Sequence, residues 1–142
     1  MLIKLDMANA FDRVDRSFLC KVLLSFGFSS QFVNLIKACI KKPWITPLVN
    51  GRATNFFQSQ RGIRQGCPFS PFMYIIMAES LSRKLTAEKI SGNILGLKPF
   101  LDAEAMNHAL FVDDSLLLGR ASIRIARAIN AVLNDYAEPL GH

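Results

Sequence analysis

The stretch that decides the fold is Asn107-His-Ala-Leu-Phe-Val-Asp-Asp-Ser-Leu-Leu-Leu118. Its adjacent carboxylates, Asp113 and Asp114, lie between two apolar segments of strand length, and the short polar break suits a hairpin turn. Two carboxylates among apolar neighbours repel each other and lose hydration unless a cation lies beside them. Taken alone, an exposed Asp-Asp-Ser turn of the kind any β-hairpin can carry is the simpler interpretation. A third carboxylate on a neighbouring strand would instead indicate a metal site.

Asp6 is the candidate for that third carboxylate, because it ends the short apolar strand Leu2–Asp6. A sheet can bring this strand end to the Asp-Asp turn despite the long separation in sequence. Three carboxylates around two divalent cations about 3.5–4 Å apart are the arrangement that in-line phosphoryl transfer needs. Magnesium, with manganese as a substitute, suits these hard oxygen ligands. The sequence therefore predicts Asp6, Asp113 and Asp114 as metal ligands and catalytic residues.

Composition describes a single globular domain over residues 1–142. The chain is 51% hydrophobic, has no low-complexity run, and is long enough to bury a sizeable core. Its apolar runs are too short to span a bilayer, and no secretory or other targeting signal precedes the first strand. The three cysteines are widely spaced without a Cys-x-x-Cys pair, which favours reduced thiols and argues against a zinc module. We therefore expect an intracellular protein of the nucleus or cytoplasm with no membrane partner.

The net charge of +6 is unevenly distributed. Between Arg16 and Ala78 there are eight basic residues and no acidic one, whereas elsewhere the acidic residues outnumber the basic ones. A surface that serves only solubility usually interleaves both signs. An acid-free segment of this length instead favours a polyanionic partner such as nucleic acid. The candidate contacts are Lys37, Lys41, Lys42, Arg52 and Arg61.

Helix and hairpin signals set the expected order of elements. Asp15 is a candidate N-cap for a helix to about Phe26, and Ser29 or Ser30 for a second helix that Pro43 ends. Asn50-Gly51 is the strongest hairpin signal, between strands at 45–49 and 53–58. The remaining expected elements are a turn over 7–11, a helix over 70–89 with Ser70 as N-cap and a buried first half, a strand or ribbon over 92–99, and a last helix over 122–138. This order, with hairpins rather than βαβ units, predicts an α+β fold with helices on one face of an antiparallel sheet.

Three motifs together resemble the central palm of reverse transcriptases. They are Leu5-Asp6-Met-Ala-Asn-Ala-Phe-Asp12-Arg-Val, Gly62-Ile-Arg-Gln-Gly-Cys-Pro-Phe-Ser-Pro71 and His108-Ala-Leu-Phe-Val-Asp-Asp-Ser115. Each is weak alone, but all three occur in the family's order. The residue patterns of the second and third motifs are similar to those of LINE-type (non-LTR) retrotransposon polymerases, especially those of plants. The resemblance extends from residue 2 to about 138.

The resemblance implies an RNA-directed DNA polymerase that acts on an RNA template, a DNA primer and deoxyribonucleoside triphosphates. Asp6, Asp113 and Asp114 match the family's metal-binding aspartates. Phe11 matches its steric gate, an aromatic ring that excludes a 2′-hydroxyl, although an ordinary core aromatic is the commoner fate of a Phe. The matching nucleotide-pocket residues are Arg64, Gln65 and Gly66.

The sequence also departs from the family's pattern. Val112 stands where Ala is usual before the Asp pair, and Phe69 stands where Leu is common. Because the family's fingers and thumb blocks are not matched, we expect a truncated palm with unknown protein partners. The alternatives are a catalytically inactive relic that retains only nucleic-acid binding, and another palm enzyme. Phe11 argues against an RNA-templated RNA polymerase, and the lack of a Gly-Gly-Asp-Glu-Phe run argues against a nucleotidyl cyclase.

Overall fold

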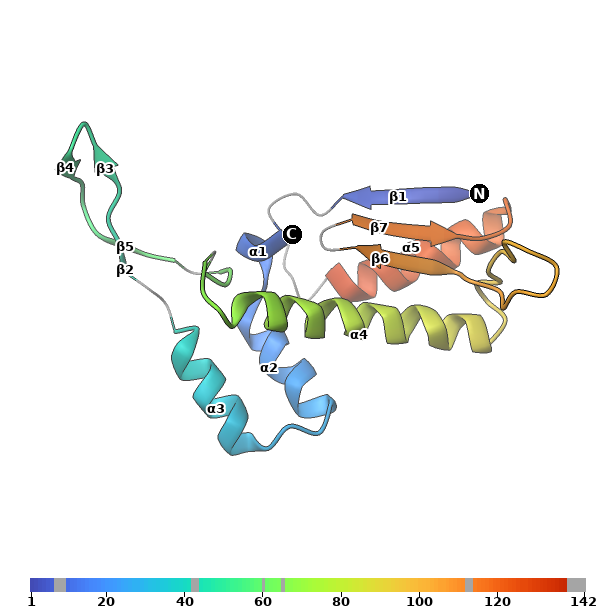
Figure 1. The fold of residues 1–142 in the computed structure, drawn as a ribbon, viewed down its shortest axis with the longest axis horizontal. Coiled ribbons are helices and arrows are strands. Elements are labelled where there is room, and N and C mark those ends of the chain that lie inside the picture. The colour runs from blue at the N-terminus through green and yellow to red at the C-terminus, as the bar shows by residue number, and fades with distance from the viewer. Residues whose placement is uncertain (7–9, 42–43, 60, 65, 112–113, 138–142) are drawn as a thin grey trace.

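The computed structural model describes residues 1–6, 10–41, 44–59, 61–64, 66–111 and 114–137. Its centre is a three-stranded antiparallel sheet in the order β1-β7-β6, formed by β1 (Leu2–Asp6), β6 (His108–Phe111) and β7 (Asp114–Leu118). β7 lies between the other two strands, although β1 and β7 come from opposite ends of the chain (Figure 1). The predicted antiparallel sheet is confirmed.

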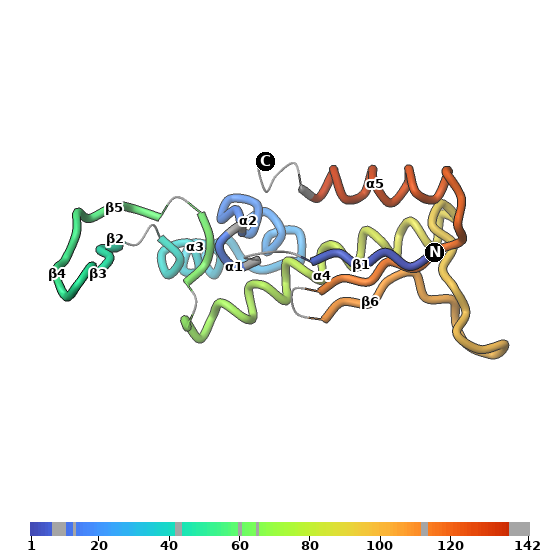
Figure 2. The backbone as a smooth tube through the Cα atoms, turned by 90° about the horizontal axis from the view of Figure 1, so that it is seen from above, coloured from blue at the N-terminus to red at the C-terminus, as the bar shows by residue number. Residues whose placement is uncertain are grey.

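One face of this sheet carries the apolar residues. Ile3 and Leu5 of β1 alternate with exposed residues, and Leu117 of β7 is fully buried. They pack against the second half of α4 (Ser70–Ile90) and against α5 (Ile123–Ala137), which runs behind the strands (Figure 1) and along one side of them in Figure 2. Successive side chains of a strand point to opposite faces, and Lys4 and Asp6, on the other face, are exposed. Among the described residues, no helix covers that face, which we call the open face. The predicted arrangement, with helices on one face, is therefore confirmed.

A second core lies under the first half of α4. It is built by α2 (Arg16–Ser25) and α3 (Ser30–Cys39), which bury Leu19, Leu23 and Ile36 against Met73 and Met77. Both helices begin as predicted. The Asp15 carboxylate accepts a hydrogen bond from the Phe18 amide at 2.7 Å, and the Ser29 hydroxyl accepts one from the Phe32 amide at 3.2 Å.

α4 belongs to both cores and joins them. Tyr136 of α5 donates its hydroxyl to the Met77 carbonyl at 2.8 Å, and its ring meets Phe18 of α2 edge to face at a centroid distance of 5.7 Å. Burial raises the pKa of Tyr136 to about 12, so the hydroxyl keeps its proton and remains a donor. One side chain therefore connects three helices at the junction of the cores.

The Asn50-Gly51 hairpin is also confirmed, with shorter strands than expected. Both turn residues have positive φ (51° and 76°), as a type I′ turn requires. The strands are two residues each: β3 (Leu48–Val49) pairs with β4 (Arg52–Ala53), and β2 (Trp44–Ile45) with β5 (Phe57–Gln58). This hairpin projects away from the body of the molecule (Figure 1).

Three local predictions were wrong. A turn was expected over 7–11, but residues 10 and 11 belong to a short helix, α1 (Ala10–Arg13); residues 7–9 lie outside the described residues. Ser70 does not cap α4, because its hydroxyl donates to the Arg64 carbonyl instead. Segment 92–99 is not a strand, since only Leu97 forms a bridge, with Met106. The partners lie six residues (Ser70–Arg64) and nine residues (Leu97–Met106) apart across loops, beyond the few residues that cap and turn patterns span.

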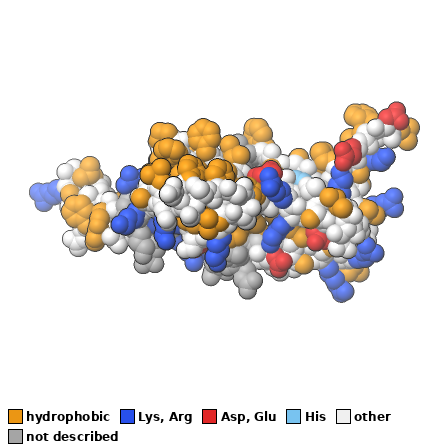
Figure 3. All heavy atoms as spheres, turned by 90° about the horizontal axis from the view of Figure 1, so that it is seen from below, with side chains coloured by type: hydrophobic (Ala, Val, Ile, Leu, Met, Phe, Trp, Pro, Cys, Tyr) orange, Lys and Arg blue, Asp and Glu red, His pale blue; other side chains and the backbone are white. Residues whose placement is uncertain are grey.

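The first half of α4 is not buried all round. Phe72 and Ile75 are 63% and 62% exposed, and Phe69 just before the helix is half exposed. Figure 3 shows hydrophobic side chains gathered on this face of the molecule, over the start of α4. An all-apolar helix surface is typical of a buried helix, but here only one side of it has neighbours. Among the helices of the described ranges, none has the length and apolar composition needed to cross a bilayer.

Adjacent leucines of α2 test the helical core. Leu23 is fully buried, whereas its neighbour Leu24 is 50% exposed. We expect Leu23→Ala to lower the free energy of unfolding by about 2–5 kcal/mol, because it leaves a cavity. Leu24→Ala, the matched control, should cost under about 1 kcal/mol. Urea unfolding followed by circular dichroism measures both, and equal losses would contradict this packing of α2.

Candidate active site

The β1–β7 pairing brings two of the predicted carboxylates together. Asp6 at the end of β1 lies directly opposite Asp114 at the start of β7. Residues opposite each other in an antiparallel pair share a face and have Cβ atoms about 4.5–5.5 Å apart. Their neighbours Leu5 and Ser115 point to the helix-covered side, so the two carboxylates lie on the open face.

The third predicted ligand, Asp113, lies outside the described residues. It directly precedes Asp114, in the connection between β6 and β7. Within the described part of the chain, no group of three metal-ligating side chains occurs. Two carboxylates at adjacent strand ends are hard oxygen donors of the kind magnesium prefers, and the open face leaves room for water and phosphate ligands. The described donors therefore fit magnesium.

Lys4 belongs to the same group of charges. Its Nζ lies 3.0 Å from Oδ1 of Asp114, and both side chains reach solvent, with exposed fractions of 60% and 39%. Lys4 is two residues before Asp6 and so points to the same open face of β1. Lys4 is not among the residues predicted from the sequence, although the alternation of charged and apolar residues along 2–6 is a signal that indicates it.

A hydrogen-bonded chain under the sheet anchors strand β6. His108 Nε2 lies 2.8 Å from the Ser82 hydroxyl of α4, and His108 Nδ1 lies 2.7 Å from Oδ1 of Asn107. Asn107 in turn donates to the Leu85 carbonyl at 2.6 Å. Burial lowers the pKa of His108, which favours the neutral ring needed to accept on one nitrogen and donate on the other. These bonds connect the strand that leads to the Asp pair to α4.

Phe11 and the glycine-rich loop share one backbone frame. The Phe11 carbonyl accepts a hydrogen bond from the Ile63 amide at 2.9 Å, and the Gly62 amide donates to Val14 at 3.0 Å. Gly62 has a φ of 83°, and a Cβ there would lie 2.8 Å from the Asp12 Cα, so only glycine allows this approach. The Phe11 ring is half-buried and lies 5.0 Å from the Tyr74 ring. The Phe11 ring is therefore partly buried in the core, and it lies beside the loop that carries Arg64.

Arg16 holds this loop from the start of α2. Its guanidinium donates to the carbonyls of Gly62, Ser59 and Arg61 at 2.8–3.0 Å, and to the Ser59 hydroxyl at 3.2 Å. Burial lowers the pKa of Arg16. One of the eight basic residues of the acid-free segment is therefore used inside the protein, which composition alone could not indicate.

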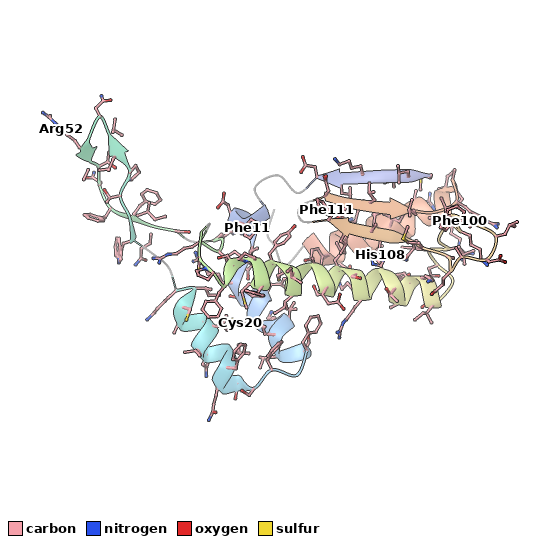
Figure 4. The ribbon with its side chains drawn as sticks, viewed as in Figure 1. Phe11, Cys20, Arg52, Phe100, His108 and Phe111 are labelled. Atoms are coloured by element: carbon pink, nitrogen blue, oxygen red, sulfur yellow. The ribbon has the colours of Figure 1, made fainter. Side chains whose placement is uncertain are left out.

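The other nucleotide-pocket and basic candidates are spread over the surface. Gly66 has a φ of 81°, and no described atom lies within 4 Å of where its side chain would begin. Arg61 and Arg64 are exposed and line a groove of about 330 Å³ beside Arg16. Lys37 and Lys41 are exposed at the end of α3, and Arg52 lies at the hairpin tip, far from Phe111 and His108 (Figure 4). Gln65 and Lys42 lie outside the described residues.

Comparisons with known proteins agree on the family. Residues 1–139 match the family model "Reverse transcriptase (RNA-dependent DNA polymerase)". The chain belongs to the reverse transcriptase family. It is 26% identical over 128 residues to the Pol polyprotein of a type-1 R2 retrotransposable element from Popillia japonica, covering 90% of this chain and 20% of that protein. It is 31% identical over 122 residues to the 149 kDa protein of transposon TX1 from Xenopus laevis, covering 84% of this chain and 9% of that protein.

These relatives identify a reverse transcriptase domain of the non-LTR retrotransposon type. The chain spans a fifth or less of their length. Among solved structures, apo telomerase from Candida tropicalis, truncated from its C-terminal domain, superposes with a TM-score of 0.67. That match covers 98% of this chain and 28% of the other at 13% identity, and it shows the fold alone. The palm-like α+β fold of this reverse transcriptase domain is thereby shown.

Arg16→Met tests the clamp on the glycine-rich loop of this reverse transcriptase domain. We expect the amides of Gly62 and Ile63 to exchange with deuterium faster by on the order of tenfold or more, because hydrogen bonds to a charged group each contribute about 1.5–3 kcal/mol. Arg16→Lys, which keeps the charge but not the planar fork, should give an intermediate rate. Lys21→Met on the exposed side of α2 is the control and should leave both amides unchanged. Unchanged amide exchange in Arg16→Met would show that the conformation of the loop does not depend on Arg16.

Proposed function

We propose that this chain forms the catalytic palm of an RNA-directed DNA polymerase that adds deoxyribonucleotides to a primer 3′ end. Asp6, Asp113 and Asp114 hold two magnesium ions, which manganese can replace. The pairing of Asp6 with Asp114 on the open face of the sheet is the observation that carries the proposal. Asp113 directly precedes Asp114 in the sequence and is included in the proposal as the third carboxylate.

Magnesium bound at these carboxylates supplies the positive charge that activates the primer hydroxyl and stabilises the leaving phosphates. The protein's own part is to hold negative oxygens at fixed places and to keep the face above them open. β1 and β7 do this by pairing, and the Ser82–His108–Asn107 chain fixes β6 beside them. Like-charged groups remain close together because the sheet, which is packed on its other face, prevents them from separating.

Phe11, Arg64, Gln65 and Gly66 form the pocket for the incoming nucleotide in this proposal. Phe11 acts as the gate that excludes a 2′-hydroxyl, since its half-buried ring is held against Tyr74 and cannot easily move aside. Arg64 offers its guanidinium to phosphate. The open space beside Gly66 allows a close approach of a ligand to the backbone. The hydrogen bond from Ile63 to Phe11 keeps the gate and the loop in register.

The template and primer contact the basic surface in this proposal. Lys37, Lys41, Arg52 and Arg61 are exposed, and Lys42 continues the run after Lys41. The four exposed cations lie in or just after α3, in the hairpin, whose tip carries Arg52 (Figure 4), and in the loop before α4, so they are spread over several elements rather than concentrated at one point. Extended placement of this kind suits the phosphates of a nucleic acid better than a single small anion.

The metal-binding part of the proposal predicts a thermal response. In millimolar magnesium or manganese, the melting temperature of the 142-residue protein should rise by roughly 3–5 °C, because the ions bind the folded state and relieve carboxylate repulsion. Asp6→Asn and Asp114→Asn should each remove most of this rise. Both variants should be no less stable than the parent without metal, since each removes one of the repelling charges.

Asp102→Asn is the matched control for these variants. Asp102 is exposed in the segment between α4 and β6, away from the Asp pair, so its substitution should leave the full metal response. A parent protein that shows no response, or a response that Asp114→Asn retains, would contradict the metal site. Nucleic-acid binding that persists without any metal response would favour the inactive, binding-only alternative.

If the basic surface binds nucleic acid, the affinity for nucleic acid should depend on salt concentration. The association constant for an RNA–DNA primer–template should fall linearly on logarithmic axes as salt rises, because each phosphate contact releases counterions. Replacing Lys37, Lys41 and Arg52 together by Met should reduce the magnitude of the slope of log K against log salt by about 1–3, because each lost phosphate contact removes up to about 0.9 from it. Lys84, Lys98 and Arg120, exposed residues outside the acid-free segment, form a control triple with the same change in charge. Equal slopes in the two triples, measured by fluorescence anisotropy, would rule out a specific basic surface.

A further inference from the structure

We propose that Lys4 is a positioning residue of the carboxylate site. Its ammonium forms an ion pair with Asp114 when no metal is bound, and a divalent ion displaces it. Lys4 thereby sets how tightly the site holds its metal. This inference rests on the function proposed above and adds a residue that the motifs do not include. It concerns the affinity for metal and requires no catalysis to be tested.

The strand register places Lys4 for this role. Lys4 lies opposite Leu116, so Asp114 is its diagonal neighbour on the same face of the sheet. Diagonal neighbours lie about 7–8 Å apart at their backbones, a gap that only a long side chain bridges. Lys4 bridges it, with its Nζ 3.0 Å from Oδ1 of Asp114. A shorter cationic side chain at this position would not reach the carboxylate.

The charges around Lys4 explain why a cation is needed there. Asp6 and Asp114 lie directly opposite each other, and like charges in that position destabilise a strand pair. Lys4 carries the opposite charge on the same open face. It neutralises part of the repulsion in the metal-free protein and so helps to keep the end of β1 paired with the start of β7. The ammonium and a divalent ion both neutralise Asp114, and they therefore compete for it.

The exposure of the pair makes that competition reversible. Lys4 and Asp114 are 60% and 39% exposed, and ion pairs that reach solvent contribute little stability because water and salt screen them. The lysine stem is flexible, so the ammonium can move into water at small cost. A divalent ion with two or more carboxylate ligands is held more strongly than one ammonium. The geometry thus gives a cation that supports the site and leaves when metal arrives.

Manganese binding tests the inference, with the free ion counted by electron paramagnetic resonance. We expect Lys4→Met, which keeps an unbranched stem one atom shorter than that of lysine and removes the charge, to bind Mn²⁺ roughly three- to tenfold more tightly than the parent at low salt. Lys4→Gln should behave alike and serves as a second variant. Lys4→Arg should stay near the parent value. The difference between parent and Lys4→Met should shrink at about 0.5 M salt, where screening weakens repulsion between the ammonium and the metal.

A double-mutant cycle without metal gives the second readout. Lys4→Met should lower the melting temperature of the parent, and it should lower that of Asp114→Asn by less, because this variant lacks the Asp114 charge. If the parent binds Mn²⁺ and Lys4→Met binds it equally or more weakly, the inference on Lys4 is overturned while the proposed metal site stands. If the parent binds no Mn²⁺ at all, the proposed function fails and the inference fails with it. Tighter binding by both neutral variants, with Lys4→Arg unchanged, supports the inference.

Discussion

The antiparallel pairing of β1 with β7 is the constraint on which the site depends. It joins residues from the two ends of the chain and fixes Asp6 opposite Asp114. Because side chains alternate between faces, a slip of one residue would turn Asp6 toward the helices and leave Leu5 on the open face. The burial of Ile3, Leu5 and Leu117 against α4 and α5 makes such a slip costly. The hydrophobic core thus specifies the register, and the register brings the carboxylates together.

α4 gives this sheet a fixed position relative to the rest of the molecule. Its first half packs in the core of α2 and α3, and its second half packs under the sheet. It also receives the polar anchors of both functional segments, since Ser82 bonds to His108 and Ser70 bonds to the Arg64 carbonyl. The loop with Arg64 is held from its other side by Arg16. One helix therefore relates the Asp pair to the glycine-rich loop, although no single motif contains both.

Local signals in the sequence predicted those elements whose causes are local. The caps Asp15 and Ser29, the Asn50-Gly51 turn and the short strand over residues 2–6 depend on a few neighbouring residues, and the structure contains each of them. The failures depend on loop conformation and packing. Ser70 bonds to the Arg64 carbonyl of the preceding loop, and the described residues cover the start of α4 on only one side. At the site, the strand pattern and the resemblance both predicted Asp6, Asp113 and Asp114. The register brings Asp6 and Asp114 together, and Asp113 lies outside the described residues. Lys4 and Arg16 were missed because their roles depend on contacts with Asp114 and with the loop, which composition does not reveal.

The same alternation separates core-packing residues from charged residues along single strands. In β1, Ile3 and Leu5 contribute to the core, while Lys4 and Asp6 lie between and after them on the open face. In β7, Leu117 is buried, and Asp114 at the strand start is partly exposed. The charged residues can therefore gather on one face without entering the core, where an unpaired carboxylate would be costly. Their mutual repulsion is the remaining cost. It arises on the face that solvent reaches, so a cation from solvent can reduce it. A sheet covered by helices on one face alone meets both needs, because its packed side supplies the stability that its charged side cannot.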